Sequence, residues 1–90
     1  MKKSEIIAAI ESRVSGNYTL WQIGITQNLE DRKTFHEVTE KKSVKFWSHW
    51  QADSLSDAQD IETYFINNKS MKGGTGGDLL PYKTTFVYIF

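Results

Sequence analysis

The sequence predicts a single α/β domain over residues 1–90, with a three-stranded, mainly antiparallel sheet flanked by helices in the order α-β-α-β-α-β. Stretches with helical spacing of apolar residues alternate with stretches rich in β-branched and aromatic residues. The length of 90 residues fits one domain, without an internal repeat or linker. An aromatic share of 13% supplies the large side chains with which a short chain can fill a core.

The first half of the chain predicts two helices and a strand. A helix is expected at 4–14, where Ser4 is a candidate N-cap and apolar residues recur every three or four positions. Residues 18–26 are rich in β-branched and aromatic side chains and predict a strand. Asn28 is a suitable cap for a second helix at 29–39.

The second half predicts a strand, a helix and a terminal strand. Residues 43–52 carry large side chains on both faces, a pattern typical of a central strand covered on each side. Ser56 begins a capping-box pattern that predicts a helix at 56–69. A glycine-rich loop follows at 71–78, and alternating aromatic residues at 84–90 predict the last strand.

Composition excludes several classes of protein. The chain has no Cys, so a disulfide framework or a cysteine zinc site is excluded. The only apolar stretch near the start is short, which favours a cytoplasmic protein over a secreted or membrane protein. Eleven basic and eleven acidic residues cancel, and this balance counts against high-affinity binding of DNA.

Two helices carry charged residues where apolar ones are expected. At about 100° per residue, Glu62 lies inside the apolar stripe of the helix at 56–69. Arg32 and His36 share a face of the helix at 29–39 and project from, or border, the side that should meet the sheet. Because buried charge is costly unless it is paired or metal-bound, Glu62 and Arg32 predict either a functional site or a structural ion pair between helices.

The glycine-rich loop is a second candidate site. Successive glycines allow concave arrangements of backbone N–H groups that hold anions. The residues expected to contact a phosphate are Lys72, Gly73, Gly74, Thr75 and Gly76. A simple connecting loop is the alternative, since the segment lacks the P-loop pattern.

The central part of the chain resembles the GIY-YIG nuclease family. Ile23-Gly24-Ile25-Thr26, followed by a helix with Arg32 and His36, is similar to the second half of the family motif and the helix after it. Glu62 falls on the position of the family's metal-binding glutamate. The resemblance covers about residues 20–67 and implies a GIY-YIG-like fold in which Glu62 holds Mg²⁺ or Mn²⁺ and Arg32 stabilises the phosphate charge.

Two departures from the family pattern concern the general base. Gln22 stands where the family has the tyrosine of its second triplet, and the strand of the first triplet is missing upstream. We expect the strand at 86–90 to pair beside residues 18–26 in its place, as in a permuted fold. Tyr88 would then supply the tyrosine, and Tyr88 or His36 would assist water. Gln22 and Gly24 would line the ligand site.

The sequence leaves two functions open. The first is metal-dependent binding and hydrolysis of a phosphodiester of nucleic acid or a nucleotide. The second is a catalytically inactive module that recognises a nucleotide or a protein partner. Retention of Gly24, Arg32, His36 and Glu62 favours hydrolysis, whereas Gln22 and the neutral net charge favour the inactive module.

Overall fold

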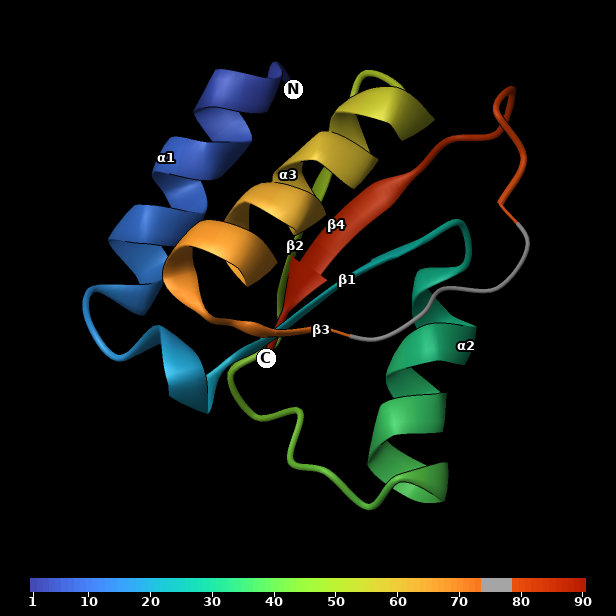
Figure 1. Cartoon of the computed structure of the whole chain (residues 1–90). Coiled ribbons are helices and arrows are strands. Elements are labelled where there is room, and N and C mark those ends of the chain that lie inside the picture. The colour runs from blue at the N-terminus through green and yellow to red at the C-terminus, as the bar shows by residue number, and fades with distance from the viewer. Residues whose placement is uncertain (74–78) are drawn as a thin grey trace.

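A computed structural model describes residues 1–73 and 79–90. Within them the predicted α/β class is confirmed, with three α-helices around a four-stranded mixed sheet (Figure 1). The elements in chain order are α1 (Lys3–Val14), β1 (Gln22–Thr26), α2 (Leu29–Thr34), β2 (Ser48–Gln51), α3 (Leu55–Lys69), β3 (Lys72–Gly73) and β4 (Phe86–Ile89). A 3₁₀ turn at Tyr18–Leu20 precedes β1, and a π-helical turn at Phe35–Thr39 extends α2.

The sheet has the strand order β2-β4-β1-β3. The expected pairing of the last strand beside β1 is confirmed, since β4 runs antiparallel to β1 and places Tyr88 opposite Gly24. The expectation of three strands is wrong for the described residues. The two-residue β3 adds a fourth, parallel strand because Lys72 and Gly73 leave α3 directly alongside the start of β1.

The main core lies between the sheet and the pair α1 and α3, which lie side by side on one face of it (Figure 1). Alternate residues of β1 and β4 point into this core, and the residues with no exposed surface there include Ile6, Ile10, Ile23, Ile61, Phe65, Val87 and Ile89. Each such side chain contributes about 1.5–3 kcal/mol on burial. The intervening residues of β1 and β4 belong to the opposite face, where Tyr88 contacts His36 in the turn that extends α2.

The strand predicted at 43–52 differs most from the structure. Only Ser48–Gln51 form β2, which is an edge strand and not the expected central one. The large residues that suggested a central strand belong partly to the preceding loop, in which Phe46 is 56% exposed. The positions with strand neighbours on both sides are taken by β4 and β1, because their apolar residues are buried most completely.

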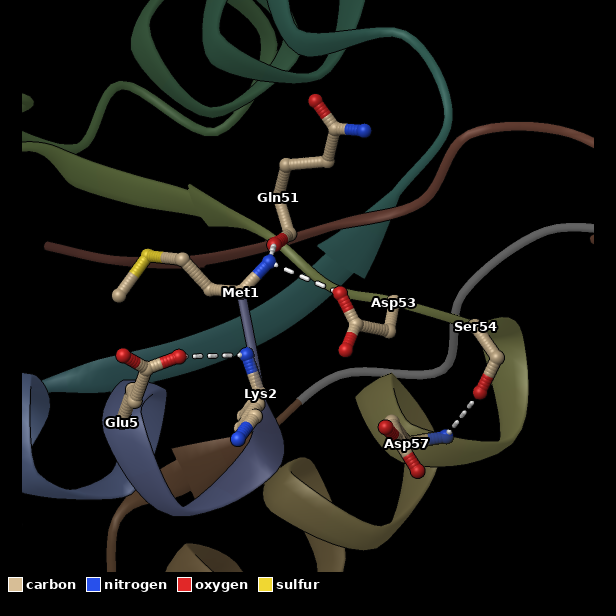
Figure 2. Close-up of polar contacts among 7 residues, drawn as sticks. All are labelled: Met1, Lys2, Glu5, Gln51, Asp53, Ser54 and Asp57. Carbon is tan, nitrogen blue, oxygen red and sulfur yellow. Dashed lines mark hydrogen bonds and ion pairs between the residues drawn. The ribbon is translucent and has the colours of Figure 1, made fainter.

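The helix starts are set by side-chain caps that differ partly from prediction. Ser54, not Ser56, caps α3 by accepting a hydrogen bond from the Asp57 N–H at 3.0 Å (Figure 2). Lys2, not Ser4, precedes α1, and its backbone N–H donates to the Glu5 carboxylate at 2.9 Å. The Met1 amino group donates to the Gln51 carbonyl and the Asp53 carboxylate, which ties the start of α1 to the β2–α3 connection (Figure 2).

The cap predicted for α2 is confirmed, since Asn28 Oδ1 accepts from the Asp31 N–H at 3.1 Å. The helical span ends in a π-helical turn in which the Glu40 N–H donates to the Phe35 carbonyl. Such turns are frequent at functional sites because they change which residues face inward. His36 is 4% exposed, whereas the residues on either side of it are exposed.

None of the helices in residues 1–73 and 79–90 combines the length and the hydrophobicity needed to cross a bilayer.

Candidate functional site

The centre of the candidate site is the Gly24–Tyr88 pair on the α2 face of the sheet. The two residues are opposite each other in the antiparallel β1–β4 pair. The Tyr88 ring lies across Gly24, so that a Cβ at position 24 would overlap the Tyr88 hydroxyl and lie 2.9 Å from Cε2. Gly24 is therefore the residue that allows a tyrosine side chain to lie against the sheet here.

A chain of hydrogen bonds leads away from Tyr88. The Tyr88 hydroxyl is 2.7 Å from Nε2 of His36, and Nδ1 of His36 contacts the Glu40 carboxylate. A carboxylate can only accept, so His36 donates its Nδ1–H to Glu40, and in this neutral tautomer Nε2 accepts a hydrogen bond from the Tyr88 hydroxyl. Glu40, His36 and Tyr88 thus form a carboxylate–imidazole–hydroxyl relay comparable in chemistry to a catalytic triad.

Aromatic rings surround this relay. The Trp47 ring stacks on Tyr88 with centroids 4.5 Å apart, and it also stacks on Phe90 at 5.6 Å. His36 lies against the Phe90 ring at 4.6 Å. These contacts leave Tyr88 only 4% exposed and hold both its ring and the imidazole in fixed positions.

The charges near Tyr88 shift its pKa in opposite directions. Burial raises the pKa of Tyr88 to about 12, and the carboxylates of Glu62 and Glu40 add to this rise, whereas the Arg32 guanidinium lowers the pKa. The hydrogen bond from His36 lowers the pKa of Glu40, with Lys42 contributing. Arg32 and Glu62, which come from different helices, therefore both act on the Tyr88 hydroxyl.

Within the described residues, Glu62 has a buried side-chain oxygen that the rest of the chain leaves without a partner. Its Oε2 atom is buried and has no hydrogen-bond partner. Burial raises the pKa of this carboxyl group. Within residues 1–73 and 79–90, Glu62 forms no ion pair with Arg32, so the structural ion pair considered from the sequence is not present.

Arg32 borders an open hollow at the end of β1. One part of it, with a volume of about 350 Å³, is lined by Thr26, Asn28, Asp31, Arg32 and Phe35. An adjoining part of about 290 Å³ shares Thr26, Asn28 and Arg32 and adds Lys83. The Arg32 guanidinium lies 5.2 Å from the centre of the Phe35 ring, which keeps it at the surface of the hollow. Arg32 and Lys83 line the hollow with one carboxylate, that of Asp31, and this excess of positive charge favours an anionic ligand.

Gln22 lies at the other end of β1, away from Arg32. Its side-chain oxygen accepts a hydrogen bond from Lys42 Nζ at 2.7 Å. Gln22, Lys42, Ser43 and Lys72 line a separate hollow of about 240 Å³ with Leu20 and Phe90. The structure thus separates Gln22 and Lys72 from the Arg32 hollow, and Tyr88 lies between the two.

The residues predicted for the site divide into three groups. Gly24, His36 and Tyr88 lie together, Arg32 and Glu62 act electrostatically on Tyr88, and Gln22 and Lys72 lie in the second hollow. Gly73 is in β3, where a Cβ would overlap the end of the Ile66 side chain. The expectations for Gly74, Thr75 and Gly76 concern residues outside the described part of the chain.

Sequence reasoning missed Glu40 and Trp47. Glu40 follows His36 by four residues, a spacing that places two side chains together on a helix, and this signal could have identified it. Trp47 was assigned to a strand, so that its stacking on Tyr88 from a loop could not be read from the pattern.

Few protein ligands are available for a metal. The described residues hold no group of three His, Cys, Asp or Glu side chains that could surround an ion. Mg²⁺ is often bound by one or two carboxylates and completed by water and substrate phosphates. The buried, unpartnered Oε2 of Glu62 fits such a cation, with most of the remaining ligands supplied by water and phosphate.

No family model, curated protein or solved structure matches this chain.

Proposed function

We propose that this chain is a GIY-YIG-like domain that binds a phosphodiester of nucleic acid or a nucleotide and hydrolyses it with a divalent metal. The observation that carries the proposal is the Tyr88–His36 hydrogen bond across Gly24, with Arg32 and Glu62 both close enough to shift the pKa of Tyr88. This set of residue types is what activation of water beside a phosphate requires.

The first step is binding of the phosphate in the Arg32 hollow. Arg32 presents a planar guanidinium that pairs with phosphate oxygens through two parallel hydrogen bonds. Lys83 adds a second positive charge on the adjoining side of the hollow. A divalent cation on Glu62 would neutralise part of the charge that develops on the phosphate.

In the proposed reaction, the Glu40–His36–Tyr88 relay removes a proton from water. His36 Nε2 accepts the Tyr88 proton, and the Glu40 carboxylate stabilises the imidazolium that results. The tyrosinate oxygen then accepts a proton from water. The Arg32 charge favours the tyrosinate and the Glu62 charge opposes it. Neutralisation of the Glu62 charge would therefore lower the pKa of Tyr88 toward neutral pH.

The burial of Tyr88 favours a second candidate function. Trp47 covers the tyrosine ring, and only 4% of the residue is exposed. In a catalytically inactive binding module, the relay would hold α2 against the sheet while Arg32 and Lys83 recognise a phosphate on a nucleotide or a protein partner.

Cleavage and binding assays on matched variants test the proposal. Wild-type protein with Mn²⁺ or Mg²⁺ is incubated with labelled single-stranded DNA, duplex DNA and RNA, and phosphate binding is followed by amide chemical shifts of α2 and β1. We expect chelator-sensitive cleavage that falls at least about 100-fold in Arg32→Gln and in Tyr88→Phe. Lys2→Gln, which removes an exposed cation that lines none of the described hollows, is the control and should retain cleavage.

Two outcomes would count against hydrolysis. Phosphate binding at Arg32 without cleavage of any substrate would support the inactive module. Absence of both cleavage and phosphate-dependent shifts near Arg32 would overturn the proposal as a whole.

A further inference from the structure

An exposed aromatic groove lies at the end of the sheet opposite the Arg32 hollow. It is lined by Leu20, Trp21, Phe46 and Phe90 and has a volume of about 300 Å³. Leu20 is 74% exposed and Phe46 is 56% exposed. The hollow with Gln22, Lys42, Ser43 and Lys72 shares Leu20 and Phe90 with it, so the two form one continuous surface. We call this surface the aromatic groove.

The rings of the groove are edged by positive charge. The Arg13 guanidinium lies 6.0 Å from the centre of the Trp21 ring, and Lys45 Nζ lies 5.6 Å from that of Phe46. Lys42 and Lys72 line the polar part of the groove. Of these four cations, Lys42 is 3.5 Å from the Glu40 carboxylate, and the other three form no ion pair with any carboxylate in residues 1–73 and 79–90.

Acidic residues are absent from the sequence segments that supply most of the groove, although Glu40 lies beside Lys42. Residues 12–29 and 41–52, which supply most of its lining, contain Arg13, Lys41, Lys42 and Lys45 and no Asp or Glu. The acidic residues are concentrated instead in residues 5–11, 30–40 and 53–62. The neutral net charge of the chain therefore conceals a local positive surface around exposed aromatic rings.

We propose that the aromatic groove binds single-stranded nucleic acid, with bases stacked on the exposed Phe46 ring and the half-buried Trp21 and Phe90 rings, and with the backbone contacted by Lys42 and Lys72. Aromatic faces next to cations are the features by which proteins hold unpaired bases and their phosphates. Bases within a duplex cannot stack on the rings in this way. An apolar protein partner would gain nothing from the surrounding cations.

The distance between the groove and the Arg32 hollow sets how many nucleotides connect them. Gln22 and Thr26 lie at opposite ends of β1, about 13 Å apart at about 3.3 Å per residue. A stacked strand rises about 3.4 Å per nucleotide, so about four nucleotides span from the groove to the Arg32 hollow. The inference rests on the proposed function, because it names single-stranded nucleic acid as the polymer whose phosphodiester reaches Arg32.

The test measures binding of an oligothymidylate of eight nucleotides to the full chain without metal, by fluorescence anisotropy and by the indole N–H signal of Trp21. Stacking contributes about 1–3 kcal/mol per base, so Phe46→Ala should raise Kd at least about fivefold. Leu20→Ser should act in the same direction. Tyr82→Ala, which removes a ring that is 80% exposed elsewhere, is the control and should leave Kd unchanged.

Salt dependence tests the charged part of the groove. In Lys72→Ala the slope of log K against log salt should become shallower by about 0.7, the value for one phosphate contact on a single strand. The control Lys2→Ala should retain the wild-type slope. An RNA octamer should bind like DNA, and the matching duplex should bind more weakly.

The outcomes separate this inference from the proposed function. Binding that depends on Phe46 but not on Arg32, without cleavage, would support the groove and contradict hydrolysis. Cleavage that is lost in Arg32→Gln but unchanged in Phe46→Ala would support hydrolysis and overturn the groove. Equal affinity for duplex and single strand, or binding of an acidic peptide in preference to the oligonucleotide, would also overturn it.

Discussion

The Tyr88 side chain occupies the space that a side chain on Gly24 would need. The two residues face each other across β1 and β4, and a Cβ at position 24 would overlap the Tyr88 hydroxyl. Trp47 stacks on the same ring with centroids 4.5 Å apart, so that Tyr88 has little freedom to move away. The relay from Tyr88 to Glu40 therefore depends on a glycine in the neighbouring strand.

Gly24→Ala tests this dependence. The added methyl group should displace the tyrosine ring and cost about 1–3 kcal/mol of unfolding free energy, as overpacking does in a well-packed region. Denaturant unfolding of the single variants and of Gly24→Ala/Tyr88→Ala measures the coupling. Because the clash is with Tyr88, the alanine at 24 should cost much less in the Tyr88→Ala background. Equal costs in both backgrounds would contradict the close approach.

Tyr88→Phe tests the hydrogen bond to His36. The hydroxyl is lost while the ring remains, so that the buried Nε2 of His36 loses its partner at a cost of about 1–3 kcal/mol at neutral pH. Unfolding in urea at constant pH gives this value. Trp47 should keep its stacking on the ring, and unchanged near-ultraviolet circular dichroism of the folded variant would verify that.

The pKa of Tyr88 predicts an alkaline transition. Tyrosine titrates at about 10 in an unfolded chain, and burial raises the pKa of Tyr88 to about 12. A raised folded-state pKa stabilises the fold below pH 10, and this contribution is lost as the pH rises through about 12. The difference in tyrosinate absorbance between wild type and Tyr88→Phe should therefore titrate near pH 12. A midpoint near 10 would indicate that the hydroxyl is not held as described.

Glu40→Gln tests the outer end of the relay. The pKa of Glu40 is lowered chiefly by its hydrogen bond with His36, so its contribution to stability is present above the unfolded value of about 4.3 and is lost as the pH falls through the lower folded value. Glutamine cannot carry the charge, so the unfolding free energy of the variant should lose this dependence on pH in the acid range. Under the proposed function it should also cleave more slowly while binding phosphate as well as wild type.

Local patterns were sufficient to predict the helices, whereas the pairing of β4 with β1 was predicted from the family resemblance and its missing strand. Helical spacing placed α1 and α3 within two residues of their observed ends, and the aromatic alternation near Tyr88 predicted that this segment is a strand. The π-helical turn was not predictable in this way, because five-residue hydrogen bonding leaves no distinct spacing of apolar residues. His36 lies within this turn and Glu40 directly follows it.

The edges of the sheet were harder to predict, because tertiary contacts decide them. Phe46 and Trp47 resemble strand residues in type, but they stay in a loop, where one is exposed and the other stacks on Tyr88. For the site, helical periodicity identified Glu62 and Arg32 as charged residues on faces where apolar residues are expected. Their actual relationship, a shared influence on Tyr88 without an ion pair, depends on distances that a pattern does not contain.

Glu62→Gln decides between a structural and a metal-binding role for the buried carboxylate. The pKa of Glu62 is raised by burial, so its contribution to stability is present below about pH 4.3 and is lost as the pH rises through the folded value. At neutral pH the ionised form therefore weakens the fold, and its Oε2 has no hydrogen-bond partner. Without metal, the glutamine variant should unfold at the same or a higher denaturant concentration than wild type.

Metal supplies the second half of this test. A cation that binds only the folded chain raises the unfolding free energy by about 2.7 kcal/mol at 100 times its Kd. Thermal unfolding with Mn²⁺ should show this increase in wild type and not in Glu62→Gln, with Asp60→Asn on the exposed side of the same helix as the control. A glutamine variant that is several kcal/mol less stable without metal would instead mean that the carboxylate neutralises a buried positive charge. That result, with no response of wild type to metal, would remove the metal from the proposed function and leave the phosphate-binding module.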